Sequence, residues 1–281
     1  MRYLMAMVFM LCLVGQAHAQ ELVHFPSLDG PPATQLDGYL WRAPGPGRSP
    51  AIVLLHGCSG MFTKSGKIYS RDRDWAMRFT SMGMSVLEVD SFGPRHHGQM
   101  CSPRTFSPSL YAARAFDAYA ALRYLQSQNF VEPDRIGLLG WSQGGGTVLN
   151  TIRTSSRARP TSLPDGDFRA AVAFYPASCR KRVQGAVWSS SVPLLVLIGA
   201  DDVWTPLPPC LALMNSPAPN TKVTMKIYPG AYHDFDWPNL PVHQIPAFRT
   251  KKGVIPIEGT NNAARADALQ RVPAFFASYL R

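Results

Sequence analysis

The stretch IGLLGWSQGGG at residues 136–146 decides the fold of this chain. Its first five residues are apolar or glycine, as in a buried strand, and it ends in a run of glycines close to Ser142. The pattern predicts a strand over 136–140, a sharp turn at Ser142 and a helix over 143–153. Glycines around a serine leave room for other parts of the molecule to come close to it.

The five residues Gly140-Trp141-Ser142-Gln143-Gly144 have the pattern G-x-S-x-G. Between a strand and a helix, this pattern predicts a serine nucleophile on a turn whose backbone angles most residues avoid. The following helix points the positive end of its dipole at the serine, where negative charge would develop. The alternative is a glycine-rich turn that contains a serine by chance.

A serine nucleophile requires a base, and the base requires a group that orients it. The segment PLLVLIGADDVWTP at 193–206 predicts a buried strand followed by two acids, Asp201 and Asp202. The segment KVTMKIYPGAYHDF at 222–235 predicts another strand, and the turn after it carries His233. Serine, aspartate and histidine, each placed just after a strand, have the order of a hydrolase triad. Either aspartate could be the acid.

A second turn is predicted to hold the negatively charged oxygen of the reaction. The apolar run AIVLL at 51–55 predicts a strand, and HGCSG at 56–60 follows it as a turn punctuated by glycine. We expect the backbone N–H groups of Cys58 and Gln143 to form the oxyanion hole. No two histidines have the i, i+4 spacing of a helical metal site, so neither a metal nor a cofactor is implied.

Strand-like and helix-like segments alternate along the chain. Strands are predicted over 21–25, 35–41, 51–55, 84–89, 136–140, 170–174, 194–198 and 223–228, and helices over 73–82, 108–128, 143–153 and 262–280. The alternation predicts an α/β fold, a mostly parallel eight-stranded sheet with helices on both faces. Proline- and glycine-rich stretches at 92–108, 155–168 and 236–259 are expected to be loops that shape a substrate pocket.

Residues 1–19 have the features of a signal peptide. Arg2 supplies positive charge, an apolar run covers 4–14, and AHA at 17–19 is a small-x-small cleavage site. The apolar run is too short to span a bilayer, and no later segment is long and apolar enough to do so. We therefore expect residues 20–281 to form a single domain that is exported, either periplasmic or secreted.

Four cysteines lie outside the predicted signal peptide: Cys58, Cys101, Cys179 and Cys210. In an oxidising compartment they are expected to form two disulfides, for which three connectivities are possible. The alternative is four free buried thiols.

The chain is basic, with a formal net charge of +10 and a pI of about 9.6. Its Lys and Arg residues are scattered, and the runs at 180–182 and 251–252 are short and contain no aromatic residues. This distribution predicts a solvated basic surface and no nucleic-acid partner.

With these segments placed, the chain resembles the dienelactone hydrolase family of the α/β-hydrolase superfamily. The resemblance runs from about residue 50 to the C-terminus and rests on LLHGCSG, VLEVDSFGPR, RIGLLGWSQGGG, AAVAFYPASC, PLLVLIGADDVWTP and YPGAYHDF. In that family the acid stands three residues after the strand-terminal glycine and four before a proline. Asp202 holds this position between Gly199 and Pro206, so the resemblance implies Asp202 as the acid.

The chain differs from characterised members of that family at two positions. They carry a cysteine nucleophile and a glutamate in the oxyanion loop, where this chain has Ser142 and Gly57. A hydroxyl forms no resting anion and needs no such partner, so the two differences are consistent with each other.

The resemblance also implies substrate-binding residues and a disulfide pairing. The family uses arginines for a substrate carboxylate, and Arg95 matches one of them, with a structural salt bridge as its alternative role. Trp141, together with Trp204 and Trp237, either lines an apolar pocket or belongs to the core. Because turns after adjacent strands lie side by side in this fold, the expected disulfides are Cys58–Cys101 and Cys179–Cys210.

The predicted reaction is hydrolysis of a carboxylic ester or lactone through an acyl-enzyme. The expected partner is therefore a small-molecule substrate. Ser142 attacks the carbonyl, His233 takes its proton, and Asp202 orients the imidazole. A thioesterase or a peptidase would use the same triad. A non-catalytic binding protein on this scaffold would have lost a triad member, and none is missing.

Overall fold

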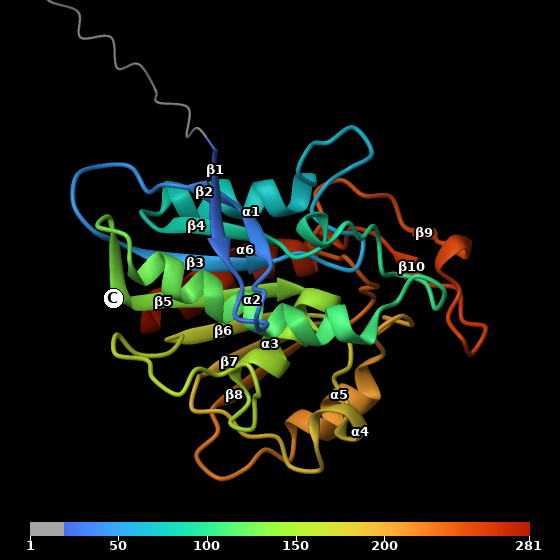
Figure 1. Cartoon of the computed structure of the whole chain (residues 1–281). Helices are drawn as coiled ribbons and strands as arrows, with labels where there is room; N and C mark the ends of the chain where they lie inside the picture. Colours follow the sequence, from blue (N-terminus) through green and yellow to red (C-terminus); the bar gives the residue numbers. More distant parts are fainter. Residues whose placement is uncertain (1–19) are drawn as a thin grey trace, which may run out of the picture.

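The computed structural model describes residues 20–281, so the predicted signal peptide at 1–19 lies outside the described residues. Its centre is an eight-stranded sheet of order β1-β2-β4-β3-β5-β6-β7-β8 (Figure 1). The strands are β1 (Glu21–Pro26), β2 (Gln35–Trp41), β3 (Ser49–Leu55), β4 (Ser85–Asp90), β5 (Val131–Trp141), β6 (Ala170–Phe174), β7 (Leu194–Gly199) and β8 (Val223–Tyr228). Strand β2 pairs antiparallel with both β1 and β4, and all other neighbouring strands of this sheet pair parallel, which confirms the predicted α/β-hydrolase architecture.

Helices cover both faces of the sheet. The longer ones are α1 (Ser70–Ser81), α2 (Pro108–Gln126), α3 (Gln143–Ile152) and α6 (Asn262–Tyr279), and two shorter ones are α4 (Lys181–Gln184) and α5 (Leu207–Met214). Figure 1 shows α2 and α3 on one face and α1 and α6 on the other. Residues 51–55 of β3 are fully buried because side chains from both layers cover them, which explains their uninterrupted apolar sequence.

The parallel strands place their carboxyl ends at one edge of the sheet. Leu55 of β3 is in register with Gly140 of β5, and Gly199 of β7 with Tyr228 of β8. The turns that follow these strands therefore lie side by side at that edge, where ligands bind in open α/β sheets.

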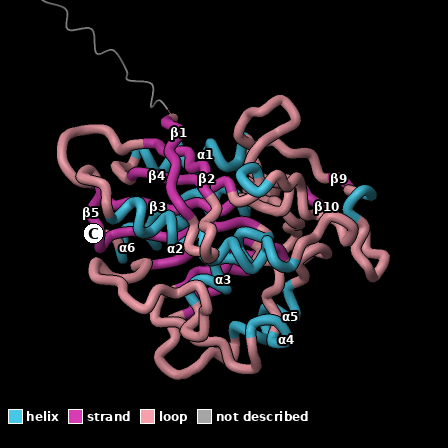
Figure 2. Tube along the Cα trace, viewed as in Figure 1, coloured by secondary structure: helices cyan, strands magenta, loops and turns pink. Residues whose placement is uncertain are grey.

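Two boundaries differ from the sequence prediction in ways that affect the site. Helix α1 begins at Ser70, three residues before the predicted start, because Arg71 and Asp72 are buried against the sheet edge and extend the helix. The predicted loop 236–259 contains a short hairpin of β9 (His243–Gln244) and β10 (Ile257–Glu258) with a 3-10 turn between them. Figure 2 shows this mostly irregular segment projecting beyond the end of the sheet.

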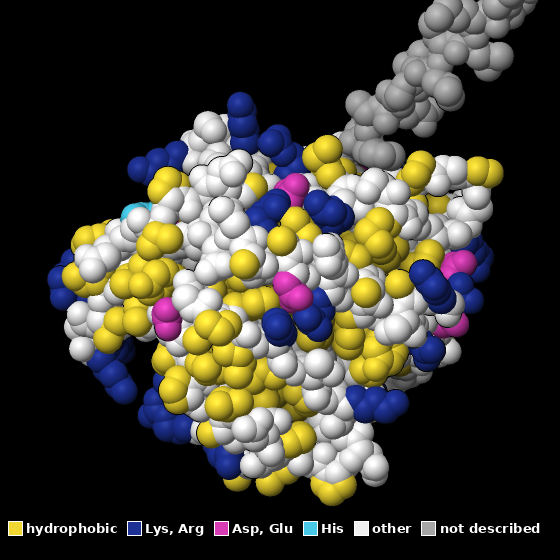
Figure 3. Space-filling model, turned by 180° about the vertical axis from the view of Figure 1, so that it is seen from behind, with side chains coloured by type: hydrophobic (Ala, Val, Ile, Leu, Met, Phe, Trp, Pro, Cys, Tyr) yellow, Lys and Arg dark blue, Asp and Glu magenta, His cyan; other side chains and the backbone are white. Residues whose placement is uncertain are grey.

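The surface agrees with the scattered charge of the sequence. In the face drawn in Figure 3, Lys and Arg side chains stand in separate groups between apolar and polar areas. Within residues 20–281, no helix has the length and apolar character needed to cross a membrane.

Candidate active site

Ser142 occupies the predicted sharp turn between β5 and α3. Its φ of 53° and ψ of −112° are angles that non-glycine residues rarely adopt. A Cβ on Gly144 would collide with the carbonyl oxygen of Leu55, and one on Gly140 would collide with the carbonyl oxygen of Gly144. Only glycines at these two positions allow α3 to begin so close to the end of β3.

Asp202 follows β7 and lies against His233. One oxygen, Oδ2, is 2.7 Å from His233 Nδ1 and accepts a hydrogen bond from the Thr205 hydroxyl at 2.7 Å. The other, Oδ1, accepts hydrogen bonds from the backbone N–H groups of Trp204 and Thr205, both at 2.8 Å. Asp202 is 3% exposed, whereas the neighbouring Asp201 is exposed to solvent, so Asp202 is the aspartate of the pair that contacts His233.

His233 lies in the turn after β8, with its ring between two aromatic side chains. Its centroid is 4.5 Å from that of Tyr175 and 4.9 Å from that of Trp204. Burial alone would lower the pKa of His233, but the charges of Asp202, Asp234 and Glu258 outweigh burial and raise the pKa. Its second nitrogen, Nε2, is buried and has no hydrogen-bond partner among the described residues.

His233 and Ser142 line one pocket, which has an empty volume of about 310 Å³ including its open mouth. The oxyanion turn, residues 57–60, forms one wall. The remaining walls are the side chains of Tyr69, Arg71, Trp204, Asp234 and Trp237. The pocket thus brings together the predicted nucleophile, the predicted base and the predicted oxyanion turn.

A disulfide holds the oxyanion turn in place. Cys58 is bonded to Cys101, and its carbonyl oxygen accepts a hydrogen bond of 2.7 Å from the N–H of Met100. The second disulfide joins Cys179, just before the short helix α4, to Cys210 within α5. Both predicted pairings are confirmed.

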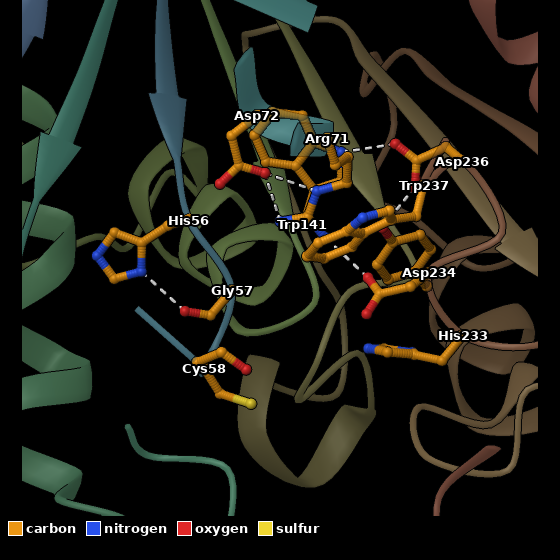
Figure 4. A network of polar contacts seen from close by, with 12 residues as sticks. His56, Gly57, Cys58, Arg71, Asp72, Trp141, His233, Asp234, Asp236 and Trp237 are labelled. Atoms are coloured by element: carbon orange, nitrogen blue, oxygen red, sulfur yellow. Dashed lines mark hydrogen bonds and ion pairs between the residues drawn. The ribbon is translucent and has the colours of Figure 1, made fainter. Parts of the chain in front are cut away.

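A buried polar network that the sequence analysis did not predict borders the pocket (Figure 4). Arg71 is its hub: Nη1 is 2.8 Å from Asp234 Oδ1, and Nη2 is 2.7 Å from Asp72 Oδ1. Its guanidinium lies over the rings of Trp141 and Trp237, 4.6 and 4.8 Å from their centroids. Burial opposes the charge on Arg71, but Asp72, Tyr175 and Asp234 outweigh burial and hold the pKa of Arg71 well above its usual value.

Another carboxyl group, that of Glu258, lies beside this network. Glu258 on β10 pairs with His233 in an isolated parallel bridge, and the N–H of Gly259 donates to the carbonyl oxygen of His233 at 3.0 Å. Burial, together with the charge of Asp234, raises the pKa of Glu258 to about 8. Burial raises the pKa of Asp234 too, but Arg71 outweighs it and the net pKa of Asp234 is lowered.

The prediction that Arg95 clamps a substrate carboxylate is wrong. Its guanidinium contacts Asp117 at 2.7 and 2.9 Å and Asp29 at 2.8 Å, and it also donates to the carbonyl oxygen of Ser91 at 2.8 Å. Arg95 does not line the pocket. Its alternative role, a structural salt bridge, is the one in the structure, because two carboxylates occupy its donors.

The prediction of Trp141 as a substrate-binding residue is also wrong. Its side chain is fully buried on the face of the sheet that α1 covers, and its Nε1 donates to Asp236 Oδ2 at 2.9 Å. The same oxygen accepts from Trp75 Nε1 at 2.8 Å. Trp204 and Trp237, in contrast, do line the pocket.

Nothing in residues 20–281 forms a cluster of three or more His, Cys, Asp or Glu side chains that could hold a metal ion. The polar side chains that line the pocket include the hydroxyl of Ser142, the imidazole of His233, the guanidinium of Arg71 and the carboxylate of Asp234.

The chain belongs to the dienelactone hydrolase family, which it matches over residues 36–280. Among curated relatives, the quorum-quenching protein AidA of Acinetobacter baumannii is 30% identical over 203 residues, covering 69% of this chain and 60% of AidA. The matches to the first curated relatives cover 37% to 64% of those relatives' own lengths.

Solved structures share the fold. The dienelactone hydrolase-like promiscuous phosphotriesterase P91, from metagenomic libraries, superposes with a TM-score of 0.62 at 19% identity, covering 93% of this chain and 99% of P91. A thermophilic esterase of Thermogutta terrifontis gives a TM-score of 0.61 at 17% identity, covering 92% of this chain and 94% of the esterase. At these identities the likeness shows the α/β-hydrolase fold.

Proposed function

We propose that this protein is a serine hydrolase that cleaves a carboxylic ester or a lactone through an acyl-enzyme. The observation that carries the proposal is the 2.7 Å contact between Asp202 Oδ2 and His233 Nδ1 in a pocket that Ser142 also lines. A buried carboxylate against Nδ1 fixes the tautomer that leaves Nε2 as a base, and Nε2 has no partner within the described residues.

The reaction has two steps. Ser142 Oγ attacks the carbonyl carbon while its proton passes to His233 Nε2, and Asp202 stabilises the imidazolium. The oxygen of the tetrahedral intermediate lies at the backbone N–H groups of Cys58 and Gln143, and the N-terminal end of α3 favours its negative charge. The alcohol leaves with the proton from His233, and water activated by the same imidazole then releases the acid.

The pocket favours small substrates. Its empty volume of about 310 Å³ includes the open mouth, and the rings of Tyr69, Trp204 and Trp237 form much of its wall. Aromatic walls of this kind suit a short acyl group or a lactone ring. A thioester or a peptide would require the same triad, so we compare all four substrate classes in the test below.

An activity-based probe and a substrate panel test the proposal. A fluorophosphonate should label the wild-type protein at Ser142, and Ser142→Ala should lose both the label and the hydrolysis of short p-nitrophenyl esters, by about 10⁴- to 10⁶-fold in kcat. Circular dichroism should show the same fold for both proteins. Unchanged turnover of the alanine variant would refute the proposal, and a panel of esters, lactones, thioesters and peptides would rank the substrates.

We also propose that the protein is exported, to the periplasm or beyond the cell. The two disulfides support this location because such bonds persist in oxidising compartments. N-terminal sequencing of the mature protein from cell fractions tests it: the first residue should be Gln20, in a fraction outside the cytoplasm.

A further inference from the structure

Arg114 lies in the middle of α2 and is fully buried, directly behind the oxyanion hole. Its Nη1 donates to Gln143 Oε1 at 2.9 Å, and its Nη2 donates to the carbonyl oxygen of His56 at 2.6 Å. Gln143 and Cys58, two residues after His56, carry the proposed oxyanion donors. One guanidinium thus contacts both segments that form the hole. Figure 4 shows Gly57 and Cys58 between His56 and His233.

Arg114 differs in its partners from the buried Arg71 and the half-buried Arg95. Arg71 and Arg95 are each bonded to two carboxylates, whereas the hydrogen bonds of Arg114 to described residues go to neutral oxygens and to the ring of His56. Burial lowers the pKa of Arg114 to about 10, although Tyr111, Asp117 and Asp90 act against this shift from longer range. The side chain is therefore a cation at neutral pH.

A buried cation without a bonded carboxylate destabilises the resting protein. The missing negative charge appears during the proposed reaction, on the substrate oxygen held by the N–H groups of Cys58 and Gln143. An interaction that becomes strong only at this stage lowers the barrier without tightening substrate binding.

We propose that Arg114 is a positioning residue whose positive charge stabilises the oxyanion through the two segments that it holds. This inference rests on the proposed serine hydrolase function. It predicts that removing the charge lowers kcat and leaves KM nearly unchanged.

Gln143→Glu tests whether a net positive charge beside the oxyanion hole matters. Glutamate has the shape of glutamine, so the contact with Arg114 remains and becomes an ion pair, while the backbone N–H of residue 143 is unchanged. The proposal predicts a melting temperature at or above that of the wild type and a kcat about tenfold lower, because the positive charge is now neutralised. An undiminished kcat in this variant would overturn the proposal.

Substitutions at residue 114 give a second test. Arg114→Gln should lower kcat by about 10- to 100-fold, while Arg114→Lys, which keeps the charge, should stay within about fivefold of the wild type despite its different donor geometry. Arg95→Gln is the matched control: it removes a cation that is bonded to Asp117, one turn along the same helix, and should change stability but not kcat. Equal kcat losses for the lysine and glutamine variants, or for Arg95→Gln and Arg114→Gln, would count against the proposal.

A transition-state analogue separates this inference from the proposed function. An alkyl boronic acid forms a tetrahedral anionic adduct with a serine nucleophile, so its Ki should rise in Gln143→Glu by the factor that kcat/KM falls. An unchanged Ki would overturn the inference. If Ser142→Ala retains activity, the proposed function itself fails; if that variant is inactive while Gln143→Glu and Arg114→Gln keep the wild-type kcat, only the role of Arg114 fails.

Discussion

Arg71 Nη1 lies 2.8 Å from Asp234 Oδ1, so a guanidinium on α1 holds the residue that follows His233. Asp234 has a φ of 56°, and Tyr175, whose hydroxyl lies 3.3 Å from the same nitrogen, has a φ of 33°. Residues in such conformations persist only where their surroundings fix them. Arg71 therefore stabilises two strained turns that border His233.

Arg71→Met should be strongly destabilising. Methionine fills part of the space but leaves Asp72 and Asp234 buried without their cation, which typically costs about 3–5 kcal/mol in free energy of unfolding. Urea denaturation measures the loss. Arg271→Met is the control, because its ion pair with Asp267 is partly exposed and should contribute about 0–1 kcal/mol. Similar losses for the two variants would contradict the role assigned to Arg71.

The pH dependence of hydrolysis should report the raised pKa of His233. Only the neutral imidazole can accept the serine proton, so kcat/KM for an uncharged ester should rise with pH and reach half its plateau above pH 6.5, the usual pKa of histidine. The rate of fluorophosphonate labelling should follow the same curve. A midpoint at or below this value would show that Asp202 and its neighbours do not outweigh burial.

Glu258→Gln should stabilise the protein selectively at alkaline pH. The pKa of Glu258 is raised to about 8 in the folded protein from the ordinary 4.5, so its contribution to stability is complete below pH 4.5 and is lost as pH rises through 8. Glutamine does not ionise. At about pH 9 the variant should therefore gain at least about 1.4 kcal/mol over the wild type, relative to the difference at about pH 5.

Chemical denaturation at the two pH values measures this gain. Glu21→Gln, at an exposed ion pair on β1, serves as the control and should produce no such gap. A gain of equal size at both pH values would contradict the assigned pKa shift.

The two disulfides should differ in their effect on activity. Removing either one, as Cys58→Ala with Cys101→Ala or as Cys179→Ala with Cys210→Ala, should cost about 2–5 kcal/mol of stability. Only the first pair should also lower kcat, because Cys58 lies in the turn that supplies an oxyanion donor. Assays at a temperature where both variants are folded make the comparison, and equal kcat values would disprove the difference.

Much of the fold and the ends of its strands could be predicted from the sequence. The runs of apolar residues and glycine around Ser142 and before His233 are local signals, and parallel strands bring the turns after them to one edge. For the same reason, the contact between Asp202 and His233 followed from their positions after neighbouring strands.

The contacts of the arginines could not be predicted in this way. Arg71 precedes the predicted start of α1, and Arg95 meets Asp29 and Asp117 only through the packing of distant segments. Arg114 did leave a signal, because it lies three residues after Tyr111 and next to Ala115, within the apolar stripe of α2. A charged residue in such a stripe indicates a buried cation with a specific partner.

The glycines around Ser142 limit how this protein can be engineered. A side chain at Gly140, Gly144, Gly145 or Gly146 would clash with main-chain atoms that cannot swing aside. Libraries aimed at new substrates should therefore leave these glycines unchanged and vary Tyr69, Trp204 and Trp237, whose side chains line the pocket.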